Sequence, residues 1–438
     1  MPQQRDHAAG AGAGQGQDIP ALVQEGRVHS SIYTDPAIFE LEMQRIFYRT
    51  WVYIGHTSEV PVEGDFRVRR IGRQPVILAR GGDGTVRVLM NRCRHRGSVV
   101  CEKESGRTKY FRCWFHGWVY DTTGKLVEVT GREAYGPDFR QDRMGLTPAP
   151  RMDEYRGFVF ASLTPEGESL RDHLAHAAEM LDFMIDASPT GEIAVDAGVH
   201  KTIYKGNWKL VGMDGYHPNF VHASVISVWQ RDADSGMGAT HREDPFDDKA
   251  LSRTRDLGNG HCMLDMRQQR MKNYPEYEAF MRKVPGGEEY MRTMIARHGE
   301  QRGRLLVALA GDPHVGIFPN MQLINNQIRI INPVSPGESE VQMYAVRLGG
   351  VSDAMNETRL RQHESFYGPA GFGSPDDAEI FERVQRGMQC SVDPWIELSR
   401  GMGRETVDAD GTIVGLITDE VTQRGQARRW RELMTQPA

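Results

Sequence analysis

Four side chains in the first third of the sequence could bind a metal, because thiolates and neutral imidazoles are good ligands of iron and zinc. One residue separates Cys93 from His95, two separate Cys113 from His116, and seventeen lie between the two pairs. Such a set suits either a structural zinc ion or a [2Fe–2S] cluster in which two imidazoles replace two thiolates on one iron. Zinc sites usually pair Cys with Cys and His with His, so one of each per loop favours the cluster and leaves zinc as the alternative.

The residues around these four side chains resemble the Rieske domain of ring-hydroxylating oxygenases. His95 is followed by Arg-Gly and His116 by Gly-Trp, as in that domain. The resemblance implies that Cys93 and Cys113 hold one iron and that the two histidines hold the other. A cluster of this kind has a potential of about −150 to +300 mV, against about −400 mV for a plant-type ferredoxin, so it can accept an electron from such a donor.

A second set of possible ligands lies near the middle of the chain, where Asp214, His217 and His222 follow an Asn-Trp-Lys segment. On a helix with 100° per residue these three side chains fall within an arc of about 140°, so that all of them can face one pocket. Pro218 removes an amide and is expected to kink the helix beside His217. Two histidines at this spacing alone are more often packed or surface residues, but their place downstream of the first motif favours ligands.

This segment resembles the catalytic iron motif of the same oxygenases. The resemblance implies that His217 and His222 bind a mononuclear non-haem Fe(II), with a carboxylate from far along the chain. A Tyr-Gly-Pro-Ala-Gly-Phe segment that ends in two acids is similar to the family's third-ligand segment; Asp377 matches the ligand position, and Asp376 and Glu379 are the fallback candidates. Two imidazoles and one carboxylate leave positions open for O₂. The same acids also suit an ordinary helix N-terminus, and the two roles are compatible.

Asp214 has a separate expected role. It precedes His217 by one helical turn, so its carboxylate can accept the N–H of that ring. The resemblance further implies a bridge from Asp214 to His116 of an adjacent protomer, which completes an electron path and requires a ring of subunits. The alternative is an ordinary helix-stabilising acid. Many relatives carry a Glu-Asn pair before this motif, which is missing here, so any role of that Asn is in doubt.

The length and apolar content suggest a globular protein of about two domains. The chain has 438 residues, a net charge of −6 and five cysteines, which argues against nucleic-acid binding and against a secreted disulfide framework. The first residues lack the apolar segment of a signal peptide, and no apolar run is long enough to span a bilayer. We therefore expect a cytoplasmic protein without a membrane partner. No Gly-rich dinucleotide fingerprint follows a predicted strand, so electrons must come from a separate reductase, with or without a ferredoxin.

Alternating segments joined by Gly-rich turns predict a small antiparallel β domain over residues 45–163, from which both ligand loops project. Residues 164–438, with 20–44 packed on them, are expected to form a catalytic domain that binds the mononuclear iron. Its expected architecture is an antiparallel sheet flanked by helices, a helix-grip (START-like) fold, so the fold class is α+β. Residues 1–19 are expected to be a flexible tail.

Individual elements follow the same division. Residues 240–304 are expected to be helices and loops, with His241, His261 and His298 as packed or solvated histidines. A charged amphipathic helix at 420–434 could dock a neighbour. The remaining expected elements are helices at 35–50, 169–185, 354–365 and 380–388, strands at 315–319, 321–325, 327–332 and 340–348, and hairpins around 81–84, 121–124 and 408–411.

Taken in order, the motifs resemble the large (α) subunit of an aromatic-ring-hydroxylating oxygenase over nearly the whole chain. The resemblance implies a terminal oxygenase that uses O₂ and electrons relayed from NAD(P)H to cis-dihydroxylate an aromatic hydrocarbon or aromatic carboxylate. It also implies a homotrimer-based assembly, either α3 or, with a small β subunit, α3β3. A monooxygenase or an O- or N-demethylase is the alternative chemistry, and an electron-transfer protein without oxygen chemistry is a second rival. Candidate pocket walls are Phe220, Val221, Tyr367 and Phe372.

Overall fold

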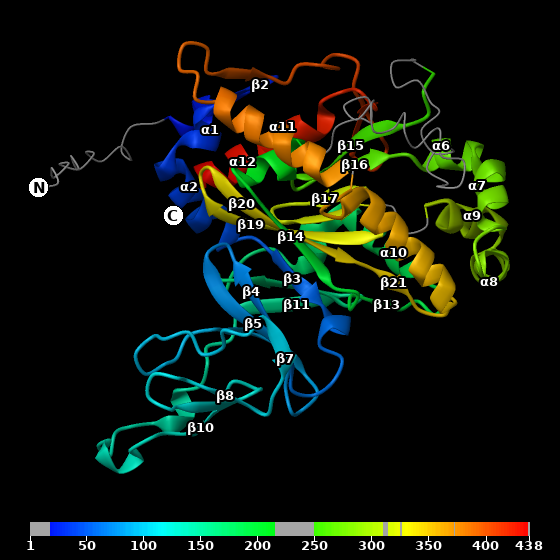
Figure 1. Ribbon diagram of the computed structural model, residues 1–438. Helices are drawn as coiled ribbons and strands as arrows, with labels where there is room; N and C mark the ends of the chain where they lie inside the picture. The colour runs from blue at the N-terminus through cyan, green and yellow to red at the C-terminus, as the bar shows by residue number, and fades with distance from the viewer. Residues whose placement is uncertain (1–17, 215–248, 310–313, 325, 372, 437–438) are drawn as a thin grey trace, which may run out of the picture.

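The fold is known from a computed structural model, which describes residues 18–214, 249–309, 314–324, 326–371 and 373–436. Small antiparallel sheets form one end of the molecule, and a large antiparallel sheet flanked by helices forms the other (Figure 1). The α+β fold class predicted from the sequence is confirmed. The expected tail falls mostly on residues 1–17, which lie outside the described residues, whereas a short 3₁₀ turn already begins at Ile19.

Three small antiparallel sheets make up the N-terminal end. Their strands are β3 (Val52–His56), β4 (Asp65–Ile71), β5 (Gln74–Arg80), β6 (Val86–Met90), β7 (Ser105–Arg107), β8 (Tyr110–Arg112), β9 (Val119–Asp121), β10 (Leu126–Glu128), β11 (Arg151–Tyr155) and β12 (Phe158–Ser162). The strand orders are β6-β5-β4-β7, β10-β9-β8 and β11-β12-β3. The hairpins predicted around 81–84 and 121–124 join β5 to β6 and β9 to β10, as expected.

A nine-stranded antiparallel sheet forms the core of the other end, in the order β14-β20-β19-β18-β17-β16-β15-β24-β23. The strands are β14 (Val199–Tyr204), β15 (Arg253–Gly258), β16 (His261–Asp265), β17 (Val315–Ile317), β18 (Met321–Ile324), β19 (Gln327–Ser335), β20 (Glu338–Ala345), β23 (Thr406–Val407) and β24 (Ile413–Leu416). The four predicted consecutive strands are confirmed. The helices expected within residues 240–304 are present, but the strands β15 and β16 in the same range were not predicted, because their polar residues obscure the strand pattern.

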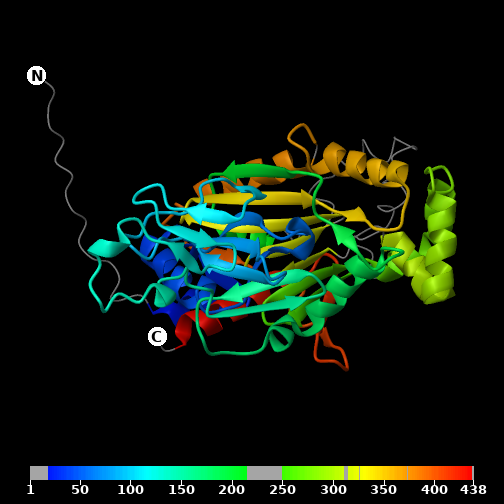
Figure 2. The ribbon, with the colours of Figure 1, turned by 90° about the horizontal axis from the view of Figure 1, so that it is seen from below.

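Helices cover this sheet, and α7 to α9 stand together at one end of it (Figures 1 and 2). The helices of this end are α2 (Pro36–Glu42), α3 (Leu170–Leu174), α4 (Ala178–Asp186), α6 (Arg267–Lys272), α7 (Tyr274–Met281), α8 (Gly287–His298), α9 (Glu300–Leu309), α10 (Asp353–Tyr367), α11 (Gly373–Gly387) and α12 (Val421–Thr435). Two π-helical turns accompany them: η2 (Met43–Phe47), which continues α2, and η7 (Leu210–Asp214). The predicted helix at 169–185 is interrupted at Ala175, whose φ is 43°. The C-terminal helix α12 packs on β15 and β16 of its own chain, and residues such as Trp430 are fully buried, so this face is not available to a neighbour.

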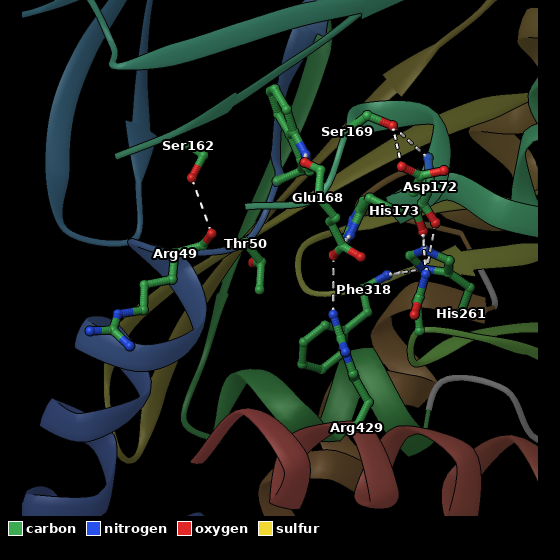
Figure 3. A network of polar contacts seen from close by, with 12 residues as sticks. Arg49, Thr50, Ser162, Glu168, Ser169, Asp172, His173, His261, Phe318 and Arg429 are labelled. Atoms are coloured by element: carbon green, nitrogen blue, oxygen red, sulfur yellow. Dashed lines mark hydrogen bonds and ion pairs between the residues drawn. The ribbon is translucent and has the colours of Figure 1, made fainter. Parts of the chain in front are cut away.

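A polar network joins the segment after β12 to the large sheet and to α12 (Figure 3). The Nε2 atom of His261 lies 2.6 Å from the carbonyl oxygen of His173, and the Phe318 amide donates to Nδ1 of His261 at 3.0 Å. Because Nδ1 accepts, Nε2 carries the proton, and the imidazole is neutral. Burial lowers the pKa of both histidines. Glu168 joins Arg429 of α12 to His173, so three distant segments share one set of contacts.

Candidate metal centres

The two loops that carry the predicted cluster ligands have the same backbone turn. In each loop, the amide of the glycine four residues after the cysteine donates to that cysteine's carbonyl oxygen, at 3.0 Å from Gly97 to Cys93 and at 2.9 Å from Gly117 to Cys113. Both glycines have a positive φ, 79° and 72°, a region that other residues rarely adopt. The sequence therefore builds two matching loops, each of which presents one sulfur and one imidazole.

Both pairs of side chains come together between these loops. The ring centroids of His95 and His116 lie 4.6 Å apart, and Trp118 stacks on His95 at 5.0 Å. Cys93 and Cys113 are buried. The Nδ1 atoms of both histidines are buried, and within the described part of the chain neither has a hydrogen-bond partner. A buried polar atom without a partner is costly, and a bound metal removes that cost, so these residues fit a metal centre.

The spacing of the four ligand atoms distinguishes a cluster from a single zinc ion. A tetrahedral zinc ion keeps its nitrogen and sulfur ligands about 3.3–3.8 Å apart. Among the described residues, the only set of three metal-binding atoms within 4.8 Å of one another lies elsewhere, in the catalytic end. The side chains of the two loops thus do not have the close mutual spacing that a single tetrahedral zinc ion requires.

Tyr120 on β9 contacts one of the four ligand residues, Cys93. The Arg94 amide donates to its hydroxyl oxygen at 3.1 Å, and the same oxygen lies 3.2 Å from Sγ of Cys93. Either the hydroxyl or the thiol can donate in this contact, but a deprotonated sulfur bound to iron could only accept, so the hydroxyl would then be the donor. Burial and this contact with Cys93 raise the pKa of Tyr120, so the hydroxyl stays protonated as a donor.

The elements expected to hold the catalytic iron lie on one face of the large sheet. Gln322 of β18 donates to the carbonyl oxygen of Val211 in η7 at 2.6 Å, and Ser374 of α11 contacts the sulfur of Met343 in β20. Gln322 and Met343 pair with the same residue of β19 from its two sides, so their side chains project to the same face of the sheet. Strands β18 and β20 are about 10 Å apart. The start of α11, which carries Asp377, thus shares this sheet face with η7, which leads to the histidine motif.

Buried polar contacts anchor the start of that motif. The Glu42 carboxylate accepts from Nζ of Lys209 at 2.6 Å, from Nε1 of Trp208 at 2.8 Å and from Nε1 of Trp430 at 2.7 Å. Lys209 and Glu42 are fully buried. Burial lowers the pKa of Lys209, and the adjacent Glu42 opposes that change. These contacts join the end of α2, the two residues just before η7, and α12, so they fix where the motif enters the sheet face.

The structure places the remaining predicted site residues unevenly. His217 and His222 lie outside the described residues, as do the candidate pocket residues Phe220, Val221 and Phe372, and of Asp214 only the backbone at the end of η7 is described. Asp376 in the first turn of α11 and the next residue, Asp377, are half-buried, whereas Glu379 is exposed and pairs with Arg383 at 2.7 Å. Tyr367 is buried at the end of α10.

Comparison with known proteins decides the family. Residues 50–139 match the model of the Rieske [2Fe–2S] domain, and residues 170–436 match that of the ring hydroxylating α subunit catalytic domain. This chain belongs to the ring-hydroxylating α subunits. Its cofactors are therefore a Rieske [2Fe–2S] cluster and a mononuclear iron, as predicted, and its class is that of the Rieske non-haem iron oxygenases.

Three similar proteins illustrate the relationship. This ring-hydroxylating α subunit is 35% identical over 392 residues to the large subunit of anthranilate 1,2-dioxygenase from Acinetobacter baylyi, covering 86% of this chain and 80% of that one. It is 36% identical over 385 residues to the 2-halobenzoate 1,2-dioxygenase large subunit from Burkholderia cepacia, with the same shares covered. The solved structure of naphthalene 1,2-dioxygenase from Rhodococcus sp. bound to indole superposes with a TM-score of 0.76 at 26% identity, covering 96% of this chain and 98% of that one.

Two polar groups of this α subunit were not predicted from the sequence. Glu42 gave no signal because a single acid in an amphipathic helix looks like a solvated residue. The second group, His200, His363 and Glu364, comes together only because the end of α10 contacts β14. In the sequence, only the adjacent His363 and Glu364 within one helix could be seen. Within the described ranges, no helix is both long and apolar enough to cross a membrane.

Proposed function

We propose that this chain is the terminal oxygenase of a multicomponent aromatic dioxygenase and that its substrate is an aromatic carboxylate. The observation that supports the oxygenase chemistry best is the shared sheet face, because it brings the start of the histidine motif beside the helix of Asp377. The choice of an aromatic acid over a hydrocarbon rests on the two relatives described above, which act on anthranilate and on 2-halobenzoate.

The residues have distinct proposed roles. Cys93, Cys113, His95 and His116 hold the cluster, with the two orphaned Nδ1 atoms as the nitrogen ligands. His217, His222 and Asp377 hold the iron. When bound, the cluster supplies single electrons and the iron supplies a site for O₂ activation. The two loops keep four ligands fixed before metal arrives, and Tyr120 donates a hydrogen bond to the sulfur of Cys93.

We infer that electrons pass between protomers. Strands β8 and β10 lie at the end of the molecule opposite to α11, which favours a route through a neighbouring chain over one within the chain (Figure 1). Trp114 is 88% exposed and Phe115 is 56% exposed, and both flank His116. Large exposed aromatic residues are typical of contact surfaces. Asp214 of one protomer would then meet His116 of the next in an α3 or α3β3 ring.

The proposed division into domains is 45–163 for the cluster and 164–438, with 20–44, for the iron. Strand β2 (Arg27–His29) pairs with β22 (Trp395–Glu397), which supports assigning the N-terminal segment to the catalytic end. A separate reductase, with or without a ferredoxin, would supply electrons from NAD(P)H, and a β subunit would complete α3β3. Because this donor is a cytoplasmic metabolite, we place the enzyme in the cytoplasm.

Product analysis with ¹⁸O₂ tests this function. The reconstituted system is supplied with benzoate, anthranilate and 2-chlorobenzoate, and with biphenyl as a hydrocarbon control. Dihydroxylation of an acid puts two labelled atoms into each product molecule. One labelled atom, or loss of an N- or O-methyl group from a methylated arene, would instead assign a monooxygenase or demethylase. Turnover of biphenyl alone would overturn the carboxylate assignment while leaving the oxygenase assignment intact.

A further inference from the structure

A second group of possible metal ligands lies where helix α10 meets the edge strand β14. His200 of β14 faces His363 and Glu364 near the end of α10, and one ligand atom from each lies within 4.8 Å of the other two. Nε2 of His200 is 2.7 Å from Oε1 of Glu364. The ring centroids of the two histidines are 5.6 Å apart, with 15° between their planes.

The centroid spacing of the two rings suits two imidazoles on one ion, whereas their stacked planes, 15° apart, require the more exposed His200 ring to turn before both nitrogens face that ion. A metal–nitrogen bond of about 2.0–2.1 Å puts each ring centre about 3.2 Å from the metal, so two such rings at 110–120° lie about 5–6 Å apart. The observed 5.6 Å between His200 and His363 falls inside that range. An ordinary ion pair between His200 and Glu364 does not require the second histidine at this distance.

His363 has a nitrogen available for a ligand. Its side chain is 1% exposed, and its Nδ1 atom is buried without a hydrogen-bond partner in the described part of the chain. Its Nε2 atom lies 3.2 Å from the side-chain amide of Gln327, whose nitrogen donates to it in the orientation that also lets the Gln327 oxygen accept from Arg329. The hydrogen of the neutral ring is then on Nδ1, so an ion at Nδ1 would move that proton to Nε2, where the Gln327 oxygen could accept it after the amide turns over. Burial, and then the nearby His200, lower the pKa of His363 to about 4, so the ring is uncharged at neutral pH. Glu364 is exposed and gives an ion access from solvent.

We propose that His200, His363 and Glu364 bind a divalent transition-metal ion, with Zn²⁺ as the best fit, at a site separate from the cluster and the catalytic iron. Two imidazoles and one carboxylate are ligands of zinc and its neighbours, whereas calcium and magnesium prefer oxygen alone. Binding displaces the proton of the hydrogen bond between His200 and Glu364. That hydrogen bond is replaced by one metal bond to each of these two side chains.

The position of this site gives the ion a structural effect. The amide of Gly368 donates to the carbonyl oxygen of Glu364 at 3.0 Å, and the chain then turns into α11, which holds Asp377. An ion on Glu364 and His363 would fix the last turn of α10 to β14. It would thereby restrain the segment that leads to the proposed iron ligand, without contact with the iron itself.

Metal counting on the iron-loaded enzyme tests the proposal. The enzyme is incubated with Zn²⁺, freed of excess ion by gel filtration, and analysed for zinc and iron per chain. We expect one added zinc in the wild type with iron unchanged, and a zinc affinity at least tenfold weaker in H200Q and in E364Q. H176Q is the matched control, because His176 faces only Asp410, at 3.9 Å, in a surface pair without a third ligand.

Two results would overturn the site. One is zinc binding that is equally tight in H200Q, E364Q and the wild type. The other is zinc uptake matched by loss of one iron per chain, which would show that the ion enters the catalytic centre instead. Both substituted side chains are partly exposed, so these variants are expected to fold, and the visible spectrum of the cluster reports that they have.

Discussion

The hydroxyl oxygen of Tyr120 lies 3.2 Å from the Sγ atom of Cys93 and accepts from the Arg94 amide at 3.1 Å, so toward a deprotonated, metal-bound sulfur the hydroxyl can act only as the donor. A hydrogen bond to a ligating sulfur withdraws negative charge from it and stabilises the reduced state of an iron–sulfur centre. The tyrosine is therefore a tuning residue for the potential of the cluster, positioned by the same loop that supplies its ligands.

We predict that Y120F lowers the reduction potential of the cluster by about 20–60 mV. One net hydrogen bond is worth about 0.5–1.5 kcal/mol, and about 1.4 kcal/mol corresponds to about 59 mV for one electron. A redox titration followed by the visible spectrum measures the shift. Y110F is the control, since Tyr110 is exposed on β8. Equal potentials in Y120F and the wild type would contradict the assignment.

We predict that D377A loses the mononuclear iron and keeps the cluster. Removing a hydrogen-bond partner of a metal ligand already lowers metal affinity or activity by about 10- to 100-fold. Removing a ligand itself should therefore lower turnover by more than about 100-fold. Iron analysis should fall from three to two per chain, with the visible spectrum unchanged. D376A, one residue away in the same helical turn, should retain iron and activity. If D376A loses them and D377A does not, the ligand is the first acid of the pair.

We predict that E42Q lowers the free energy of unfolding by about 3–5 kcal/mol, since it leaves the Lys209 charge buried without a counter-ion. Glutamine keeps the shape and can still accept from one indole, so the loss is electrostatic. Urea denaturation followed by circular dichroism measures it. E40Q in the same helix is the control: Glu40 pairs with Arg73 at the surface, and such pairs are worth about 0–1 kcal/mol.

Acid should destabilise the protein below about pH 6.5. Burial lowers the pKa of His56 to about 4, and it lowers those of His173 and His261 as well. Above pH 6.5 these rings are neutral in both states, and their contribution to stability is complete. As the pH falls from 6.5 toward 4, the unfolded chain takes up protons that the folded chain does not. Each such histidine then lowers the free energy of unfolding by up to about 1.4 kcal/mol per pH unit.

The variant H56N isolates one of these histidines. Nδ1 of His56 accepts from the Ser58 amide at 3.2 Å, and an Asn side chain can accept the same bond without titrating. The stability of H56N should fall less steeply between pH 6.5 and 5 than that of the control H29N. His29 makes the same contact with Ser31 in a half-buried setting. Parallel pH profiles for the two variants would contradict the burial effect.

Much of the fold was predictable because its elements have strong local patterns. The hairpin around 81–84 and the strand pairs of the large sheet combine alternation with turn residues, and both were found. Strands β15 and β16 were missed because residues such as Arg255 and Asp265 place an ion pair where an apolar side chain would signal a strand. The cluster ligands could be predicted as a set because they lie within 24 residues, and the structure brings them together.

Other features depend on contacts that no local pattern encodes. Asp377 could be proposed only through a resemblance, since nothing in one helix turn shows which sheet face it will share. The break at Ala175 and the burial of α12 are set by packing against distant strands. Likewise, His200 and His363 are 163 residues apart in the sequence and meet only because the C-terminal part of α10 contacts β14.

Trp430 of the last helix donates to Glu42, a residue 388 positions earlier in the chain. The buried charge pair of Glu42 and Lys209 is therefore fully enclosed only once α12 has docked. Contacts between segments so far apart in sequence are slow to form, so we expect α12 to be among the last elements of the catalytic half to reach its native position.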